Sequence, residues 1–288
     1  MVRRNVGKGA KSPTSSSEKY HPKSAVSDLV FVVGCGGVFF HGLTQLSTWA
    51  RRRGKTRFIL MDEDKIEEKN RLRQWPHPCD KNKAVVASDT LGNVFGLVSY
   101  PVKRFLEEKH DLSLVLKNKK HDYLRCGRIW VVSSPDNHLA RMLAHQAAQI
   151  LSEEKKCPVV SLTGGNDEKG GYAYATTWLG GKTELDWLLR HDDIISEAEL
   201  EIERKAHPMG CGQLEQEPEQ TVIGNVMTAS CMWGLAEHVA RERDVIEMSW
   251  TKDDVGRVQM TERKNMVYAS VLQDHLLAPD PVTKGGAE

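Results

Sequence analysis

The feature that most constrains this fold is an apolar run that ends in clustered glycines, in the stretch FVVGCGGVFFHGL. The run Leu29–Val33 predicts a buried strand, and the spacing of apolar residues in Gly37–Arg52 predicts a helix directly after it. Gly34, Gly36 and Gly37 let the backbone turn tightly and approach a ligand without an obstructing Cβ. A helix N-terminus carries unpaired N–H groups and partial positive charge, which favours phosphate. The arrangement is typical of a nucleotide-binding turn.

The glycine cluster alone does not identify the ligand. No GxxxxGK[ST] loop is present, so the turn is not of the Walker type. The third glycine of a dinucleotide fingerprint would fall at position 39, which is Phe39. A tight structural turn that binds nothing therefore stays open as an interpretation.

Strand-like and helix-like stretches alternate along the next part of the chain. Further buried strands are expected at residues 57–61, 96–102, 128–134 and 158–162, and further helices at 83–95 and 137–151. The charged stretch between the third and fourth strands is expected to be an irregular insertion. The alternating residues 171–178 predict an antiparallel strand. This order predicts an α/β fold: a doubly wound, Rossmann-like, mostly parallel sheet with helices on both faces.

The character of the chain changes after Trp178. A helix is expected at residues 222–239, and three short antiparallel strands at 245–250, 256–261 and 265–270 close the sheet. We expect four segments: a flexible basic tail (1–26), a nucleotide-binding adenylation domain (27–178), a crossover or insert loop (179–218), and a C-terminal helix with strands that completes the same domain (219–288).

Composition excludes several classes of protein. The chain has 288 residues, 40% of them hydrophobic and 27% charged, with a formal net charge of +1. This balance argues against a protein that coats nucleic acid or a membrane surface. No apolar run approaches a membrane span, and the first residues lack the apolar core of a secretory signal. Six cysteines without a CxxC pair predict free thiols in the cytoplasm and no structural zinc.

Charged and amide side chains follow the second strand. Asp62 ends that strand, where doubly wound folds place a carboxylate on ribose hydroxyls, although an ordinary turn residue is the alternative. Asn70, Arg73 and Gln74 follow, and Lys83 comes ten residues after Arg73. Two cations beside a phosphate turn suit a reaction in which charge builds up on phosphate oxygens. They contribute little to hydride transfer.

A further carboxylate follows the fourth strand. Asp136, in the stretch SSPDN, lies at the carboxyl edge of the sheet just before a helix. It either holds a magnesium ion that bridges ATP phosphates or caps the helix, and the two roles are compatible.

These elements together resemble the ThiF/MoeB/ubiquitin-activating-enzyme superfamily. The matching features, in order, are the glycine turn at 34–37, Asp62-x-Asp64, NRLRQ at 70–74, Lys83 and the Asp136–Asn137 pair. The likeness runs from about Leu29 to Trp178 and weakly on to Val239. It resembles a compact bacterial or phage-type member.

The resemblance implies ATP-dependent adenylation of the C-terminal glycine carboxylate of a ubiquitin-like or sulfur-carrier protein, with pyrophosphate as the leaving group. It implies that Asp62 holds the ribose, that Asp64 belongs to the nucleotide-binding site, and that Asn70, Arg73 and Lys83 stabilise the phosphates. Gln74 shapes the pocket and Asp136 binds magnesium. A homodimer is also implied.

This sequence departs from the family pattern in three places. Phe39 replaces a small residue of the glycine turn. The R-Y-x-R-Q segment, whose arginine reaches a neighbouring subunit's ATP, is not found, and Arg3 and Arg4 are remote from the first strand. The paired CxxC zinc motifs of many members are absent.

Cys211 is the candidate nucleophile for a thioester. It lies between Gly210 and Gly212, and Lys205 and His207 nearby favour a thiolate. A passive loop thiol is the alternative, and Cys231 is expected to be a buried core thiol.

The favoured interpretation is a ubiquitin-like-protein activating enzyme that passes its acyl group to a conjugating enzyme. The main alternative is a sulfur-carrier adenylyltransferase without an obligatory thioester. Two weaker alternatives are an NAD-dependent oxidoreductase and a non-catalytic scaffold that docks a partner.

Overall fold

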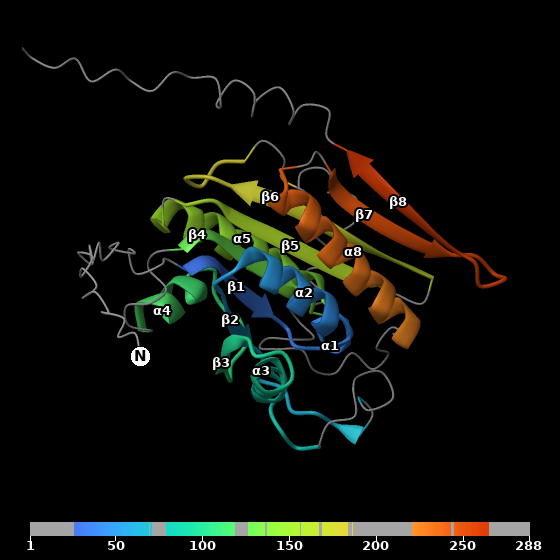
Figure 1. The fold of residues 1–288 in the computed structure, drawn as a ribbon, viewed down its shortest axis with the longest axis horizontal. Coiled ribbons are helices and arrows are strands. Elements are labelled where there is room, and N and C mark those ends of the chain that lie inside the picture. The colour runs from blue at the N-terminus through green and yellow to red at the C-terminus, as the bar shows by residue number, and fades with distance from the viewer. Residues whose placement is uncertain are drawn as a thin grey trace, which may run out of the picture.

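An eight-stranded sheet organises the chain in this computed structural model (Figure 1). The structure describes residues 26–68, 70, 79–118, 126–135, 137–155, 157–166, 169–183, 186, 221–242 and 245–264. The strand order is β3-β2-β1-β4-β5-β6-β7-β8. The strands are β1 (Val26–Val33), β2 (Thr56–Met61), β3 (Val98–Val102), β4 (Cys126–Ser133), β5 (Val159–Asn166), β6 (Gly170–Trp178), β7 (Val245–Lys252) and β8 (Val258–Lys264).

The sheet is parallel in its first part and antiparallel in its last. Strands β1 to β5 pair in parallel, and β6, β7 and β8 are added in antiparallel fashion. The expected fold class is therefore confirmed. The strand expected at 265–270 lies outside the described residues.

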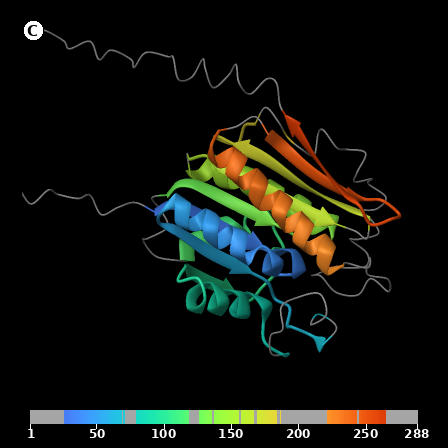
Figure 2. The same cartoon turned by 45° about the vertical axis from the view of Figure 1, so that its right-hand side comes forward.

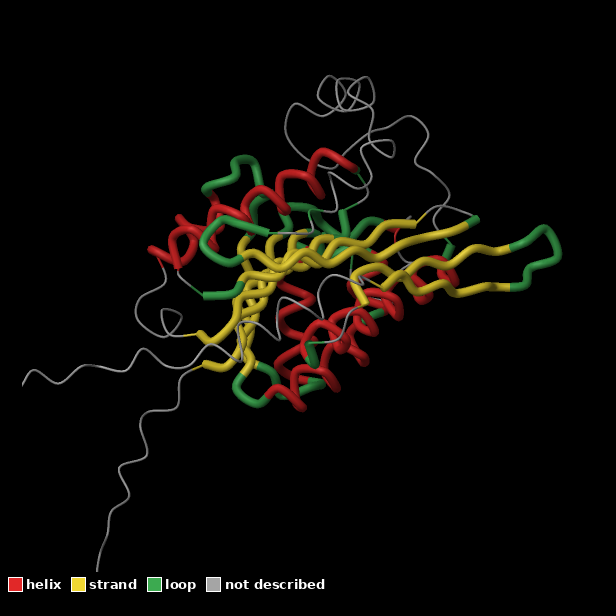
Figure 3. The backbone as a smooth tube through the Cα atoms, turned by 90° about the horizontal axis from the view of Figure 1, so that it is seen from above, coloured by secondary structure: helices red, strands yellow, loops and turns green. Residues whose placement is uncertain are grey.

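Helices cover both faces of this sheet (Figures 2 and 3). They are α1 (Gly37–His41), α2 (Leu43–Arg53), α3 (Lys83–Asn93), α4 (Asp111–Asn118), α5 (His138–Lys155) and α8 (Val222–Ala240). One hydrophobic cluster joins the sheet to α1, α2, α3 and α8, and a second joins the opposite face to α4 and α5. Each helix buries one apolar face against these clusters, which contributes most of the favourable free energy of folding.

Helix α8 packs against both strands and helices. It contacts β5, β6, β7 and α1, and its buried residues include Cys231, as expected for a core thiol. No helix in the described ranges is both long enough and apolar enough to cross a membrane. The apolar character of α8 therefore reflects packing against the sheet and its neighbouring helices.

Gly42 divides the helix that was expected to be continuous from Gly37 to Arg52. A Cβ atom at this position would lie 2.6 Å from Nε1 of Trp233 in α8. The close approach of α8 requires glycine here, and the chain turns between α1 and α2. Sequence spacing alone does not reveal this requirement for glycine, because it comes from a residue far along the chain.

The stretch between β3 and β4 corrects one expectation. It was expected to be irregular, but it contains helix α4, whose Leu112, Val115 and Leu116 are buried. The Oδ2 atom of Asp111 accepts 2.9 Å hydrogen bonds from the backbone N–H groups of both Glu107 and Glu108. Apolar spacing of i, i+3 and i+4 was the available signal, and surrounding charges obscured it.

Candidate active site

The carboxyl ends of β2, β1 and β4 meet at one edge of the sheet. Val33, the last residue of β1, is paired with Met61 on one side and with Ser133 on the other. The N–H of Gly34 donates to the carbonyl of Met61 over 3.0 Å, and the N–H of Ser134 donates to the carbonyl of Val33 over 3.2 Å. From β1 the chain proceeds to β2 and β3 on one side and then crosses over to β4 on the other side. The carboxyl end of β1 is therefore the switch point at which doubly wound folds bind ligands.

The glycine turn has two glycines with different constraints. Gly34 has φ +85°, and a Cβ there would lie 3.2 Å from the backbone nitrogen of Pro135. Gly36 is the N-cap residue of α1, and no side-chain hydrogen bond caps this end of the helix. No described atom lies within 4 Å of the position a Gly36 Cβ would take. Gly34 therefore shapes the turn, whereas Gly36 faces open space at the start of the helix and Gly37 is buried.

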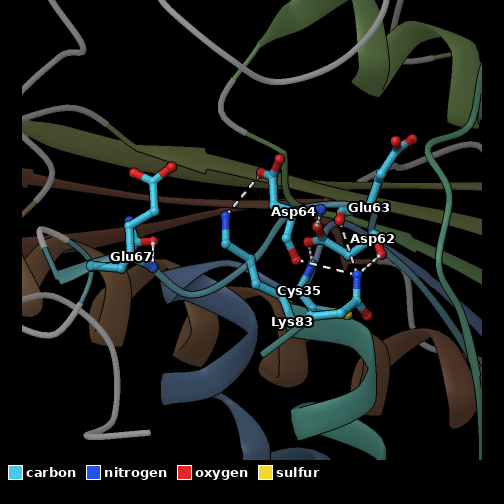
Figure 4. A network of polar contacts seen from close by, with 8 residues as sticks. Cys35, Asp62, Glu63, Asp64, Glu67 and Lys83 are labelled. Atoms are coloured by element: carbon cyan, nitrogen blue, oxygen red, sulfur yellow. Dashed lines mark hydrogen bonds and ion pairs between the residues drawn. The ribbon is translucent and has the colours of Figure 1, made fainter. Parts of the chain in front are cut away.

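Asp62 connects the glycine turn to the segment after β2 (Figure 4). Its Oδ2 atom accepts a 2.7 Å hydrogen bond from the N–H of Cys35, and its Oδ1 atom accepts a 2.9 Å bond from the N–H of Asp64. Burial raises the pKa of Asp62 to about 6, against the opposing effects of Lys83 and the two backbone donors. Asp62 thus fixes the shape of both loops.

Lys83 places a cation beside the carboxylate of Asp64. Its Nζ atom lies 2.9 Å from Oδ2 of Asp64, and its backbone N–H donates to the carbonyl of Asp64 over 2.8 Å. The side chains of Lys83 and Asp64 are 12% and 28% exposed. Figure 4 shows the ammonium directed at Asp64, with Glu63 and Glu67 directed elsewhere. The two predicted residues therefore meet at the partly open rim of the site.

Asn82 is a positioning residue that sequence reasoning missed. Its Oδ1 atom accepts from the N–H of Val85 at 3.1 Å and caps α3. Its Nδ2 group donates to the carbonyls of Asp62, Glu63 and Asp64 at 2.8, 3.0 and 3.2 Å. Asn82 thereby ties the start of α3, and Lys83 with it, to the D-x-D segment. An asparagine just before a helical pattern was the available signal.

Asn70 lies close to the same segment but makes a local contact. It is buried, and its Oδ1 atom accepts a 3.0 Å hydrogen bond from the N–H of Glu67. The N–H of Asn70 donates to the carbonyl of Glu67, also over 3.0 Å. These bonds close a turn after the D-x-D segment. The phosphate role of Asn70 stays a prediction.

The start of α5 shows which residue caps that helix. The Oδ1 atom of Asn137 accepts a 2.7 Å hydrogen bond from the N–H of Ala140. Asn137 therefore caps α5, and the capping role considered for Asp136 stays a prediction. Four predicted site residues lie outside the described residues: Arg73, Gln74, Asp136 and Cys211. Within the described ranges, no group of three or more His, Cys, Asp or Glu residues is arranged to hold a metal ion.

Arg141 is a second residue that sequence reasoning missed. It is 5% exposed, and its Nε group donates to the carbonyl of Pro135 over 2.9 Å. Its Nη1 group donates to the hydroxyl of Tyr172 over 2.7 Å, and the guanidinium lies 5.7 Å from that ring centroid. No carboxylate in the described ranges forms an ion pair with it. Arg141 holds the β4–α5 turn, which packs against Gly34.

Comparisons with known proteins place this geometry in context. No protein-family model matches the chain, and no curated protein matches it. Among solved structures, E. coli MccB with ATP superposes with a TM-score of 0.53 and 16% identity, over 82% of this chain and 63% of MccB. MccB with MccA gives a TM-score of 0.51 at 16% identity, over 83% and 65% of the two chains. PaaA gives 0.53 at 18% identity, over 82% and 72%.

The likeness to MccB and PaaA concerns the fold. The expected resemblance is confirmed at the level of the fold, which this chain shares with MccB and PaaA. At 16% identity the chain spans about 63% of MccB in its ATP-bound structure. MccB has been solved with ATP and with MccA, and it is described as a microcin biosynthetic enzyme.

Proposed function

We propose that this chain is an ATP-dependent adenylyltransferase that acts on the C-terminal carboxylate of a peptide or small carrier protein. The observation that carries the proposal is the connected network of Cys35, Asp62, Asp64 and Lys83 at the switch point of the sheet. The network lies beside the glycine turn, in which Gly36 faces open space. The fold that holds it is shared with MccB, which has been solved with ATP.

Each part of the network has a role in this proposal. The turn at Gly36 receives phosphate through backbone N–H groups at the start of α1. Each carboxylate oxygen accepts more than one hydrogen bond, so Asp62 can hold the turn and still accept from a ribose hydroxyl. Lys83 moves from Asp64 to the phosphates and neutralises the charge that develops as the carboxylate attacks the α-phosphate and pyrophosphate leaves.

Residues outside the described ranges complete the proposal. By resemblance to the family, Arg73 grips phosphate oxygens as a bidentate fork, Gln74 shapes the pocket and Asp136 holds magnesium. Cys211 then takes the acyl group as a thioester, and a conjugating enzyme accepts it. We also propose that the protein acts as a homodimer in the cytoplasm. The alternative outcome is a thiocarboxylate on a sulfur-carrier protein.

Ligand binding by the purified full-length protein tests the first step. We expect calorimetry with ATP and magnesium to detect binding and calorimetry with NAD to detect none. Lys83→Met should weaken ATP binding. Lys65→Met should not, because Lys65 is an exposed residue of the segment after β2. Binding of NAD in preference to ATP would favour the oxidoreductase interpretation and overturn the proposal.

Pyrophosphate exchange with candidate carriers ending in glycine tests the chemistry. We expect carrier-dependent exchange into ATP, together with an adduct that reducing agent removes in electrophoresis. In Cys211→Ala the adduct should disappear while the exchange remains. Full activity of this variant with a sulfide donor would support the sulfur-carrier outcome, and intact biological function of Arg73→Ala would indicate a scaffold.

A further inference from the structure

Two cysteines lie side by side at the edge of the sheet opposite the proposed active site. Cys126 begins β4, and Cys157 comes two residues before β5, the adjacent parallel strand. Both are half-buried and pack against the same hydrophobic cluster, under α4 and α5. The N–H of Ile129 donates to the carbonyl of Pro158 over 3.0 Å and joins the two strands at this point.

The strand register places the two Cα atoms at a separation that disulfides span. Ile129 pairs with Val159, so extending the register by two residues sets Cys157 opposite Gly127, next to Cys126. Strands are about 4.8 Å apart and rise about 3.3 Å per residue, which gives a Cα separation of about 6 Å. Disulfides commonly span about 4.4–6.8 Å between Cα atoms. Regular alternation along the strands would turn Cys126 and Cys157 to opposite faces, but both side chains pack against the same hydrophobic cluster, so both thiols lie on one face of the sheet.

The two thiols also differ in their chemistry. The interaction between the two thiols lowers the pKa of Cys157 and raises the pKa of Cys126. The ammonium of Lys155 lowers the pKa of Cys157 further, against the effect of burial. Cys157 is therefore the thiolate that reacts first, and Cys126 is a resolving thiol beside it.

The remaining cysteines in the described ranges lack this arrangement. Cys35 and Cys231 are buried, and burial raises the pKa of the Cys231 thiol to about 11. Cys79 is half-buried and its thiol donates to Oε2 of Glu68 over 3.1 Å. Cys79 has similar burial to Cys126 and Cys157 and therefore serves as a control within the same chain.

We propose that Cys126 and Cys157 form a dithiol site that low-molecular-weight disulfides, such as oxidised glutathione, convert reversibly to an intramolecular disulfide. The Cys157 thiolate attacks one sulfur of oxidised glutathione and releases one glutathione thiolate. The Cys126 thiolate, after losing its proton, attacks the Cys157 sulfur and releases the second glutathione. Two protein thiols are oxidised and one glutathione disulfide is reduced to two thiols, so atoms and electrons balance. This inference does not depend on the proposed adenylation.

Oxidation of the folded full-length protein with oxidised glutathione, followed by alkylation and peptide mass mapping, tests the site. We expect a cross-linked peptide pair containing Cys126 and Cys157, with the loss of two hydrogen atoms, and reversal by dithiothreitol. Cys126→Ser should instead trap glutathione on Cys157, because the resolving thiol is absent. Cys157→Ser should leave Cys126 mostly unmodified, and Cys79→Ser should leave the cross-link unchanged.

Two results would overturn the proposal. One is a separate glutathione on each of Cys126 and Cys157 in the wild-type protein, because adjacent thiols resolve a mixed disulfide. The other is full reduction of both cysteines under conditions that modify Cys79. Since the wild-type peptide map gives either result directly, a variant that failed to fold would not prevent the decision.

Discussion

The backbone N–H of Cys35 donates a 2.7 Å hydrogen bond to Oδ2 of Asp62. This bond joins the glycine turn after β1 to the segment after β2, across two adjacent parallel strands. The second oxygen of Asp62 accepts from the N–H of Asp64, the residue that pairs with Lys83. One buried carboxylate therefore sets the position of the turn and, through Asp64, of the cation.

The buried position of Asp62 predicts a pH dependence of stability. Its pKa is raised from 3.8 to about 6 in the folded protein. Because the folded value exceeds the unfolded one, the contribution is fully present below about pH 4 and is lost as pH rises through about 6. A shift of about 2 units corresponds to about 3 kcal/mol. Urea unfolding should show the wild type losing about this amount relative to Asp62→Asn across that range; parallel curves would contradict the assignment.

The positions of the buried strands along the chain were predictable, because each of these strands is a short apolar run bounded by turns. Leu29–Val33 illustrates this, since every one of its side chains is buried. The need for glycine at position 42 was not predictable, because it depends on Trp233 almost two hundred residues away. Local patterns therefore specify the elements, whereas contacts between distant segments specify which residues fit at particular positions.

The site was predictable in part. Asp62 was predicted from its place at the end of a strand, Lys83 as a cation that follows it, and Asp64 from the resemblance to the family; the structure brings the three side chains together. Asn82 was missed because its three donated hydrogen bonds require the D-x-D carbonyls to converge, which only the folded chain achieves. Arg141 was missed because a single arginine in a helical pattern is usually solvated, and its burial depends on Tyr172.

Gly34 and Gly36 should respond differently to alanine. Gly34→Ala should reduce the free energy of unfolding by about 2 kcal/mol, because φ +85° is unfavourable for alanine and the Cβ would meet Pro135. Gly36→Ala should fold normally, since no described atom is near, but its methyl group would enter the proposed phosphate space. Urea unfolding and ATP calorimetry of both variants distinguish the two effects. Equal stability losses would refute the distinction.

Asn82→Ala should lower both stability and nucleotide binding. The variant loses the cap of α3 and the donor to three carbonyls, and a lost cap alone costs about 1 kcal/mol. Lys83 is then less firmly positioned, so ATP binding should weaken as well. Asn93→Ala is the matched control, because Asn93 is exposed at the other end of the same helix. Thermal unfolding and calorimetry of the two variants should differ; similar behaviour would show that Asn82 has no positioning role.

The Arg141–Tyr172 pair offers the sharpest test of how the β4–α5 turn is held. A hydrogen bond to a charged group contributes about 1.5–3 kcal/mol, so Tyr172→Phe should destabilise the protein by about that amount. Arg141→Lys should cost more, because it also loses the bond from Nε to the Pro135 carbonyl. In a double-mutant cycle measured by urea unfolding, the two changes should couple by at least about 1 kcal/mol. If Arg141 positions the turn beside Gly34, Arg141→Lys should also raise the Km for ATP more than it lowers kcat. Additive stabilities with unchanged kinetics would mean that the turn holds its shape without the guanidinium.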